Sequence, residues 1–276
     1  MKLILIIVSA AAATVAASPD VQTIMARVGE NQARAQELRK EYMFHQKQLL
    51  RLVRGNNRIA REERREYDVT PGSETIQKSL VYFEGKYEHH GRYIEYDQPG
   101  YEYKEMDIDG DLIDDLSKDM TDDRHSKDGL GCDLFPLTAK EQRKYDFKLE
   151  AEESYRGRQV YRVSFRPKPN LENGADWKGE ALVDAEEYQP VEVHTSLAFK
   201  IPLAVKVMLG TNIRGLGFSV TYRRLEDGVW FPASYGGEFE LRALFFYARK
   251  ISISMVNENF RRTHVESNVK YAAIDQ

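Results

Sequence analysis

The sequence predicts a mainly β protein of the α+β class. We expect a large curved antiparallel sheet or half-open β-barrel, with an N-terminal helix and a few covering helices. First, most of the chain after residue 41 consists of segments in which apolar and polar residues alternate between short turn signals. Second, the turns are too short to hold crossover helices, so the strands form a meander and not βαβ units. About ten such strands favour a curved sheet or partly open barrel over a small sandwich.

Composition and charge restrict the class of protein. The 276 residues are 42% apolar, which is enough for a sizeable core, and the formal net charge is −4. A nucleic-acid-binding protein normally has a basic excess, so no nucleic-acid partner is expected. Cys132 is the single cysteine, which excludes an intramolecular disulfide and a multi-cysteine metal site.

The first 17 residues have the pattern of a secretory signal peptide. A short basic start at Lys2 precedes an apolar segment, and Val15-Ala16-Ala17 fits the small-residue rule for cleavage before Ser18. The apolar segment spans about 15 residues, whereas a membrane-spanning helix needs about 20. Ser18 stands where a bacterial lipoprotein would have a cysteine. We therefore expect a periplasmic protein, secreted by a cleaved signal peptide, with no lipid anchor and no integral membrane segment.

The mature chain is expected to begin with a helix and to continue as strands. Val21, Ile24, Met25 and Val28 fall on one helical face within residues 20–42, and Gly29 is a candidate break in that helix. Residues 58–69 have helical propensity, but turn signals bound them on both sides, so a strand is predicted. The series of strands is expected to close with 239–247 and 251–260.

An acidic insert at about 104–133 interrupts the strands. It holds 11 acids against 4 Lys or Arg, and residues 111–120 are expected to form a short helix with Leu112, Ile113 and Leu116 on one face. Three aspartates from Asp107 to Asp111 have the spacing that begins a calcium-binding loop. Leu112 and Lys118 stand where that loop needs glycine and glutamate, so a solvated acidic loop without metal is the prediction.

The remaining polar clusters do not indicate catalysis. The six histidines lack the spacing of a metal site, and no nucleophile elbow or phosphate-binding loop is present, so neither an enzyme nor a cofactor is expected. The arginines between Arg51 and Arg65 alternate with Glu62, Glu63 and Glu66. Balanced charges of this kind predict a solvated strand face with cross-strand pairs, and contact with an anionic head group is the alternative.

Two hairpins carry a resemblance to a known family. The first runs from Leu182-Val183-Asp184 through Pro190 to Val193, and the second covers Asp227 to Pro232; Phe165 to Pro169 before Trp177 fits the same group. These segments resemble bacterial outer-membrane lipoprotein-sorting proteins of the LolA and LolB type and related RseB-like periplasmic domains. The resemblance implies one LolA-like domain over residues 18–276. In that fold, helices lie over the concave face of an unclosed barrel, and the concavity holds acyl chains.

Apolar residues on both faces of a strand complete the functional prediction. Residues 199–209 and 243–247 are apolar almost throughout, and such strands need either a covering helix or a ligand. The predicted wall of an apolar cavity comprises Val191, Val193, Leu197, Phe199, Val205, Met208, Phe218, Trp230 and Phe245. The function expected is a lipid or lipoprotein carrier, with lipoprotein acyl chains or another lipid as partner. The alternative is an RseB-like sensor or interaction module with an envelope protein as partner.

Overall fold

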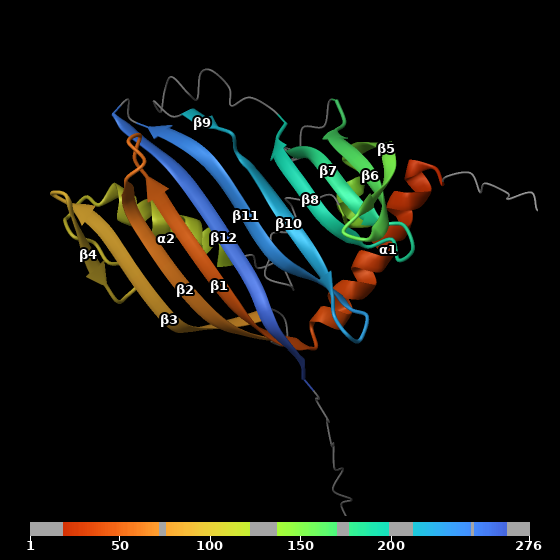
Figure 1. Cartoon of the computed structure of the whole chain (residues 1–276), viewed down its shortest axis with the longest axis horizontal. Helices are drawn as coiled ribbons and strands as arrows, with labels where there is room; N and C mark the ends of the chain where they lie inside the picture. Colours follow the sequence, from red (N-terminus) through yellow and green to blue (C-terminus); the bar gives the residue numbers. More distant parts are fainter. Residues whose placement is uncertain are drawn as a thin grey trace, which may run out of the picture.

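A large open sheet with helices on one side forms the molecule (Figure 1). The computed structural model describes residues 19–71, 76–121, 137–169, 177–198, 212–243 and 246–263. The helices are α1 (Val21–Arg39), α2 (Ile108–Thr121) and α3 (Ala139–Gln142). The strands are β1 (Tyr42–Val53), β2 (Ile59–Pro71), β3 (Ile76–His89), β4 (Arg92–Tyr96), β5 (Tyr145–Tyr155), β6 (Arg158–Pro167), β7 (Trp177–Asp184), β8 (Pro190–Leu197), β9 (Asn212–Arg214), β10 (Gly217–Arg224), β11 (Trp230–Ala243) and β12 (Tyr247–Arg262).

The strand order is β4-β3-β2-β1-β12-β11-β10-β8-β7-β6-β5, and β9 adds to β11. All pairs are antiparallel, and β4 and β5 form opposite edges, so the predicted curved and unclosed antiparallel sheet is confirmed. Two features of this order go beyond a simple meander. β1 pairs with β12, and the chain between β4 and β5 passes from one edge of the sheet to the other.

Helix α1 begins where the sequence places it. The Asp20 carboxylate accepts hydrogen bonds from the backbone N–H groups of Gln22 and Thr23, at 2.9 and 3.1 Å, which caps the first turn. Gly29 does not break the helix. A Cβ added there would lie 3.3 Å from the backbone nitrogen of Ala139, so glycine lets α3 pack closely against α1.

One strand near the C-terminus is longer than predicted. β11 runs through Gly236 and Gly237 and ends at Ala243, and Tyr247 begins β12 instead of ending the preceding strand. A Cβ at Gly237 would lie 2.7 Å from the ring of Phe218, so this glycine leaves space for an aromatic side chain from β10 without interrupting the strand.

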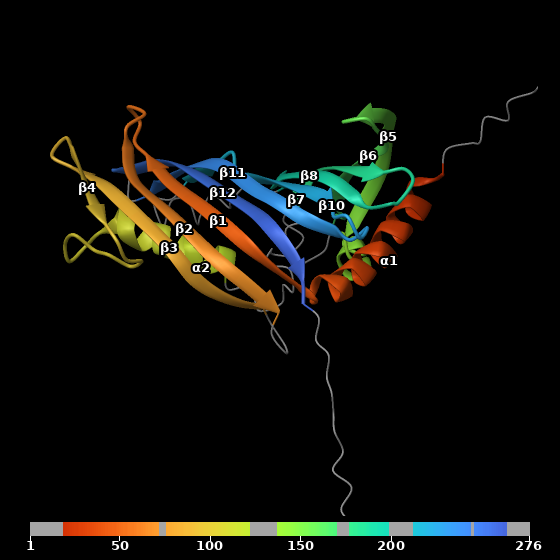
Figure 2. The same ribbon diagram turned by 60° about the horizontal axis from the view of Figure 1, so that its bottom comes forward.

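The main core lies between the sheet and its helices. We call the face covered by α1 and α2 the inner face and the opposite one the outer face; Figure 2 shows both helices on the same side. Ile24, Met25 and Val28 of α1 and Ile113 of α2 are buried in one cluster with side chains from most of the strands. This confirms the predicted apolar faces of both helices.

The acidic insert and the arginine-rich strand differ from the predictions. Residues 58–69 do lie on a strand, but Arg61 is only 1% and Asp107 only 2% exposed, so neither segment is solvated as expected. The register of β2 places Arg61, Glu63 and Arg65 on the inner face, opposite Leu52, Leu50 and Gln48 of β1. Helix α2 covers these side chains, and its acidic residues carry the charge opposite to that of the two arginines.

Candidate functional site

The inner face of the sheet is the candidate site, and its larger part is apolar. The pairing registers align Met255, Tyr235, Val220, Val193 and Ala181 in one row across five strands, from β12 to β7. All five side chains belong to the main core cluster, into which α1 inserts Ile24 and Met25.

The predicted cavity residues that the structure describes do not form one group. Val193 is fully buried in the main cluster, and the Phe218 ring stacks on Tyr235 with centroids 5.3 Å apart. Val191 and Trp230 belong to a separate cluster with Val160 and Leu182. Leu197 is half-buried at the end of β8. Phe199, Val205, Met208 and Phe245 lie outside the described residues.

The smaller part of the inner face, on β1 and β2, is polar and charged. Arg61 donates to the Asp107 carboxylate and to the Tyr96 hydroxyl, both at 2.6 Å, and Tyr96 donates to Glu63 at 2.6 Å. Burial, reinforced by the Glu63 carboxylate, raises the pKa of Tyr96 far above its usual value, so the hydroxyl stays protonated and can donate. The arginine therefore joins β2, β4 and the start of α2.

A second arginine extends this network along α2. Arg65 donates to Glu63 at 2.9 Å and to the Ser117 hydroxyl at 2.6 Å. In the first turn of the helix, Asp109 accepts from Arg249 at 2.8 Å and from the Tyr247 hydroxyl at 2.7 Å. Alternating charge in the sequence indicated ion pairs on β2, but it could not indicate that an acidic helix would be the partner.

A run of amides borders this network. Gln48 donates to Gln46, Gln46 donates to Asn257, and Asn257 donates to the Pro232 carbonyl oxygen, at 3.1, 3.0 and 3.0 Å. Within the described residues, Gln48 Oε1 is buried without a hydrogen-bond partner, and so is the hydroxyl of Thr195 on β8. The inner face therefore presents unsatisfied polar atoms on both of its parts.

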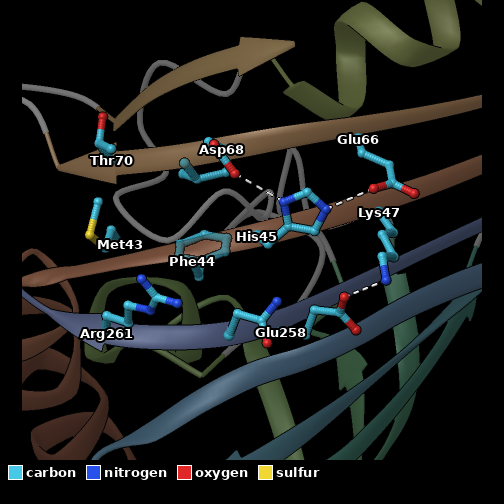
Figure 3. Close-up of a pocket in the computed structure, with 11 residues that line it drawn as sticks. Met43, Phe44, His45, Lys47, Glu66, Asp68, Thr70, Glu258 and Arg261 are labelled. Atoms are coloured by element: carbon cyan, nitrogen blue, oxygen red, sulfur yellow. Dashed lines mark hydrogen bonds and ion pairs between the residues drawn. The ribbon is translucent and has the colours of Figure 1, made fainter. Parts of the chain in front are cut away.

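A cleft of about 500 Å³ lies on the outer face (Figure 3). It forms where β12 has extra residues between the pairs Met43–Arg261 and His45–Glu258, with Asn259 at a φ of 57°. His45 lies between Asp68 and Glu66, with its Nδ1 3.0 Å from Asp68 and its Nε2 2.9 Å from Glu66. Hydrogen bonds to Asp68 and then Glu66 raise the pKa of His45.

The arrangement around His45 fits an ion pair better than catalysis. Each ring nitrogen of His45 is hydrogen-bonded to a carboxylate. Among the described residues that line the cleft, there is neither a serine nor a cysteine to act as a nucleophile. His45 was not among the site residues expected from the sequence. The signal was present, because His45 and the acids Glu66 and Asp68 lie on consecutive predicted strands.

Among the described residues, no group of three or more His, Cys, Asp or Glu side chains is arranged to hold a metal ion. In the same residues, no helix combines the length and the apolar character that crossing a membrane requires.

Comparisons with known proteins give matches in structure alone. Neither a family model nor a curated protein matches the chain. A solved outer membrane lipoprotein-sorting protein domain from Vibrio parahaemolyticus is 10% identical, covers 90% of this chain and 94% of its own, and gives a TM-score of 0.38. A DUF1329 family protein from Desulfovibrio piger is 8% identical over 92% and 96%, with a TM-score of 0.36. A LolA superfamily protein from Nitrosomonas europaea is 11% identical over 91% and 97%, with a TM-score of 0.33.

Proposed function

We propose that the protein is a periplasmic binding protein that holds an acyl chain, of a lipoprotein or of another lipid, against the inner face of its sheet. One observation carries the proposal: the inner face is apolar across β12, β11, β10, β8 and β7, in the row from Met255 to Ala181. The resemblance of the hairpins to lipoprotein-sorting proteins supports the same ligand.

Apolar burial alone provides enough affinity for such a ligand. Each buried methylene contributes about 0.8 kcal/mol, so roughly ten contribute about 8 kcal/mol, equivalent to a Kd near 1 μM before the costs of association. No buried charge or catalytic group is needed. Binding without chemistry is therefore the activity that we propose.

The proposed cavity includes residues of the apolar run outside the described ranges. Val193 and Phe218 belong to its wall, and residues 201–209 form its mouth or cover. Val205 and Met208 are the positions at which the proposal is tested, because they belong to this apolar run without being part of the described core. The proposed path to the periplasm is the signal peptide.

The experiment measures binding of a fluorescent fatty acid together with the melting temperature. Val205→Asp and Met208→Asp are expected to weaken binding at least tenfold while leaving the melting temperature nearly unchanged. Val256→Asp on the exposed outer face of β12 is the matched control and should change neither quantity. Val193→Asp should unfold the protein, because it places a charge in the core.

Two outcomes would contradict the proposal. If the variants at 205 and 208 fold and bind as the wild type does, the cavity does not involve this run. If the wild-type protein binds no fatty acid, and mass spectrometry finds no lipid in protein purified from the periplasm, the sensor or interaction module is the better function.

A further inference from the structure

One end of the sheet carries a basic cleft beside the hairpin between β11 and β12. Val53 at the end of β1 pairs with Lys250 near the start of β12, so the turn between β1 and β2 and the β11–β12 hairpin lie at the same end of the sheet (Figure 1). Between them lies a cleft of about 140 Å³, which we call the basic cleft. Its charged lining residues are Arg54, Arg242, Arg249, Lys250 and Glu240.

The charge of this cleft distinguishes it from three other clefts of the described residues. The cleft on the outer face in Figure 3 has three basic and three acidic lining residues, counting His45 as basic. The cleft at the β5–β6 and β7–β8 turns and the cleft across β5, β6 and β7 likewise have three of each. The basic cleft has four cations and one acid, in a chain whose formal net charge is −4.

Neighbouring acids hold two of the cations in place: Arg54 stays 37% exposed, whereas the Arg249 side chain is only 16% exposed. Arg249 donates to Asp109 of α2, and Arg54 donates to Glu88 of β3. Lys250 pairs with Glu238 at 2.8 Å, but both side chains are about half exposed, so the pair contributes little. Arg242 is exposed, and within the described residues no ion pair involves it.

The two most exposed large apolar side chains of the described structure lie at the same end. Phe246 of the β11–β12 hairpin is 79% exposed, and Met106 is 70% exposed. Asp109, three residues after Met106, binds Tyr247 and Arg249, which follow Phe246. The loop before α2 and the tip of the hairpin are therefore held together beside the basic cleft.

We propose that this end of the molecule docks on a phospholipid bilayer that contains anionic lipid. The basic cleft takes a head-group phosphate, and Phe246 and Met106 enter the interface between head groups and acyl chains. Aromatic and apolar side chains beside Arg and Lys are the combination that peripheral membrane proteins use. Each Lys or Arg near an anionic surface strengthens binding about fivefold. The proposal concerns one end of the sheet and not the apolar part of the inner face, so it does not rest on the proposed function.

The test is co-sedimentation of the mature chain with vesicles. We expect binding to vesicles of phosphatidylglycerol mixed with phosphatidylcholine, weaker binding to pure phosphatidylcholine, and a loss of binding at high salt because the charges are screened. Phe246→Ser and Arg242→Glu are each expected to lower binding about fivefold or more. Both residues are exposed, so the melting temperature should not change.

Two matched controls and one spectroscopic signature separate docking from a general effect. Val81→Ser removes an exposed apolar side chain from β3, and Arg156→Glu reverses an exposed charge at the opposite end of the sheet; neither should alter binding. Phe246→Trp should keep vesicle binding, and brominated lipid should quench its fluorescence more strongly than it quenches the wild type.

Three results would overturn the proposal. The first is a wild-type chain that does not sediment with anionic vesicles. The second is vesicle binding that Phe246→Ser and Arg242→Glu leave unchanged. The third is complete displacement by millimolar inorganic phosphate with no effect of Phe246→Ser, which would make the cleft a site for free phosphate.

Discussion

At the scale of single residues, the buried arginines of β2 are the least expected feature. An arginine on a strand rich in acids normally faces water, yet Arg61 lies in the core with Asp107, Glu63 and Tyr96 around it. Burying charges is costly, but removing one partner of a buried pair costs more, since it leaves the other charge unpaired. Arg61 is therefore expected to be more sensitive to substitution than its neighbours.

Replacement of Arg61 tests this network. Arg61→Met should lower the free energy of unfolding by about 3–5 kcal/mol, because Asp107 and Glu63 lose a buried partner. Arg64→Met is the control, since the Arg64 side chain is 53% exposed on the outer face of the same strand, and it should cost less than about 0.5 kcal/mol. Urea unfolding measures both. Equal and small effects would show that the network contributes little.

His45 makes stability depend on pH. Its pKa is raised by hydrogen bonds to Asp68 and Glu66, so the protonated ring stabilises the fold. This contribution is complete below the unfolded-state value near 6.5 and is lost as the pH rises through the higher folded-state pKa. Unfolding of the wild type and of His45→Gln should therefore differ more at pH 6 than at pH 9. A pH-independent difference for His45→Gln would refute the assignment.

At the scale of elements, close approaches of aromatic rings to glycines shape the sheet. Gly85 of β3 pairs with Tyr96 of β4, and the Tyr96 ring lies over the glycine. The same arrangement occurs where the ring of Phe218 lies over Gly237. In each case a missing side chain lets a ring cover the strand backbone, so the glycine serves packing and not a turn.

Gly85→Ala is expected to disturb β4 and the start of α2 together. The added Cβ would lie 2.3 Å from the Tyr96 ring, so the ring must move away from Arg61 and Glu63. The expected loss of stability is about 1–3 kcal/mol, as for other overpacked sites. Gly55→Ala, with nothing within 4 Å of the new Cβ, should be neutral or slightly stabilising. Thermal unfolding compares the two variants, and equal melting temperatures would contradict this account.

At the scale of the whole molecule, the inner face of the sheet has two characters. It is apolar from β12 to β7, where α1 covers it, and charged on β2, where α2 covers it. One sheet thus combines an apolar region with a polar region that holds a helix in place. The basic cleft and Phe246 lie at one end of this sheet, where Arg249 belongs both to the cleft and to the polar network under α2.

Export is the prediction that concerns the entire chain. Protein isolated from the periplasm is expected to begin at Ser18, because Val15 and Ala17 fit the cleavage rule. N-terminal sequencing measures the start directly. Recovery of chains that begin at Met1, or retention of the protein in membranes after a carbonate wash, would show that residues 1–17 are not cleaved off.

The sequence by itself determined the local structure of this protein. Alternation with period two predicted most strands, the spacing of Val21, Ile24 and Val28 predicted α1, and Leu112 to Leu116 predicted the buried side of α2, because these signals depend on near neighbours in the chain. The tertiary structure decided which strands pair and which face lies inside. The pairing of β1 with β12 joins residues some 200 positions apart, as Gln48 with Met255, and no local pattern encodes it. Alternation places Arg61, Glu63 and Arg65 on one face of β2, but only their partners Asp107, Asp114 and Ser117, on α2 and just before it, make it favourable for that face to lie inside. Which side chains share one face of a strand is a local property of the sequence. Which of the two faces is buried depends on partners that only the folded chain brings near.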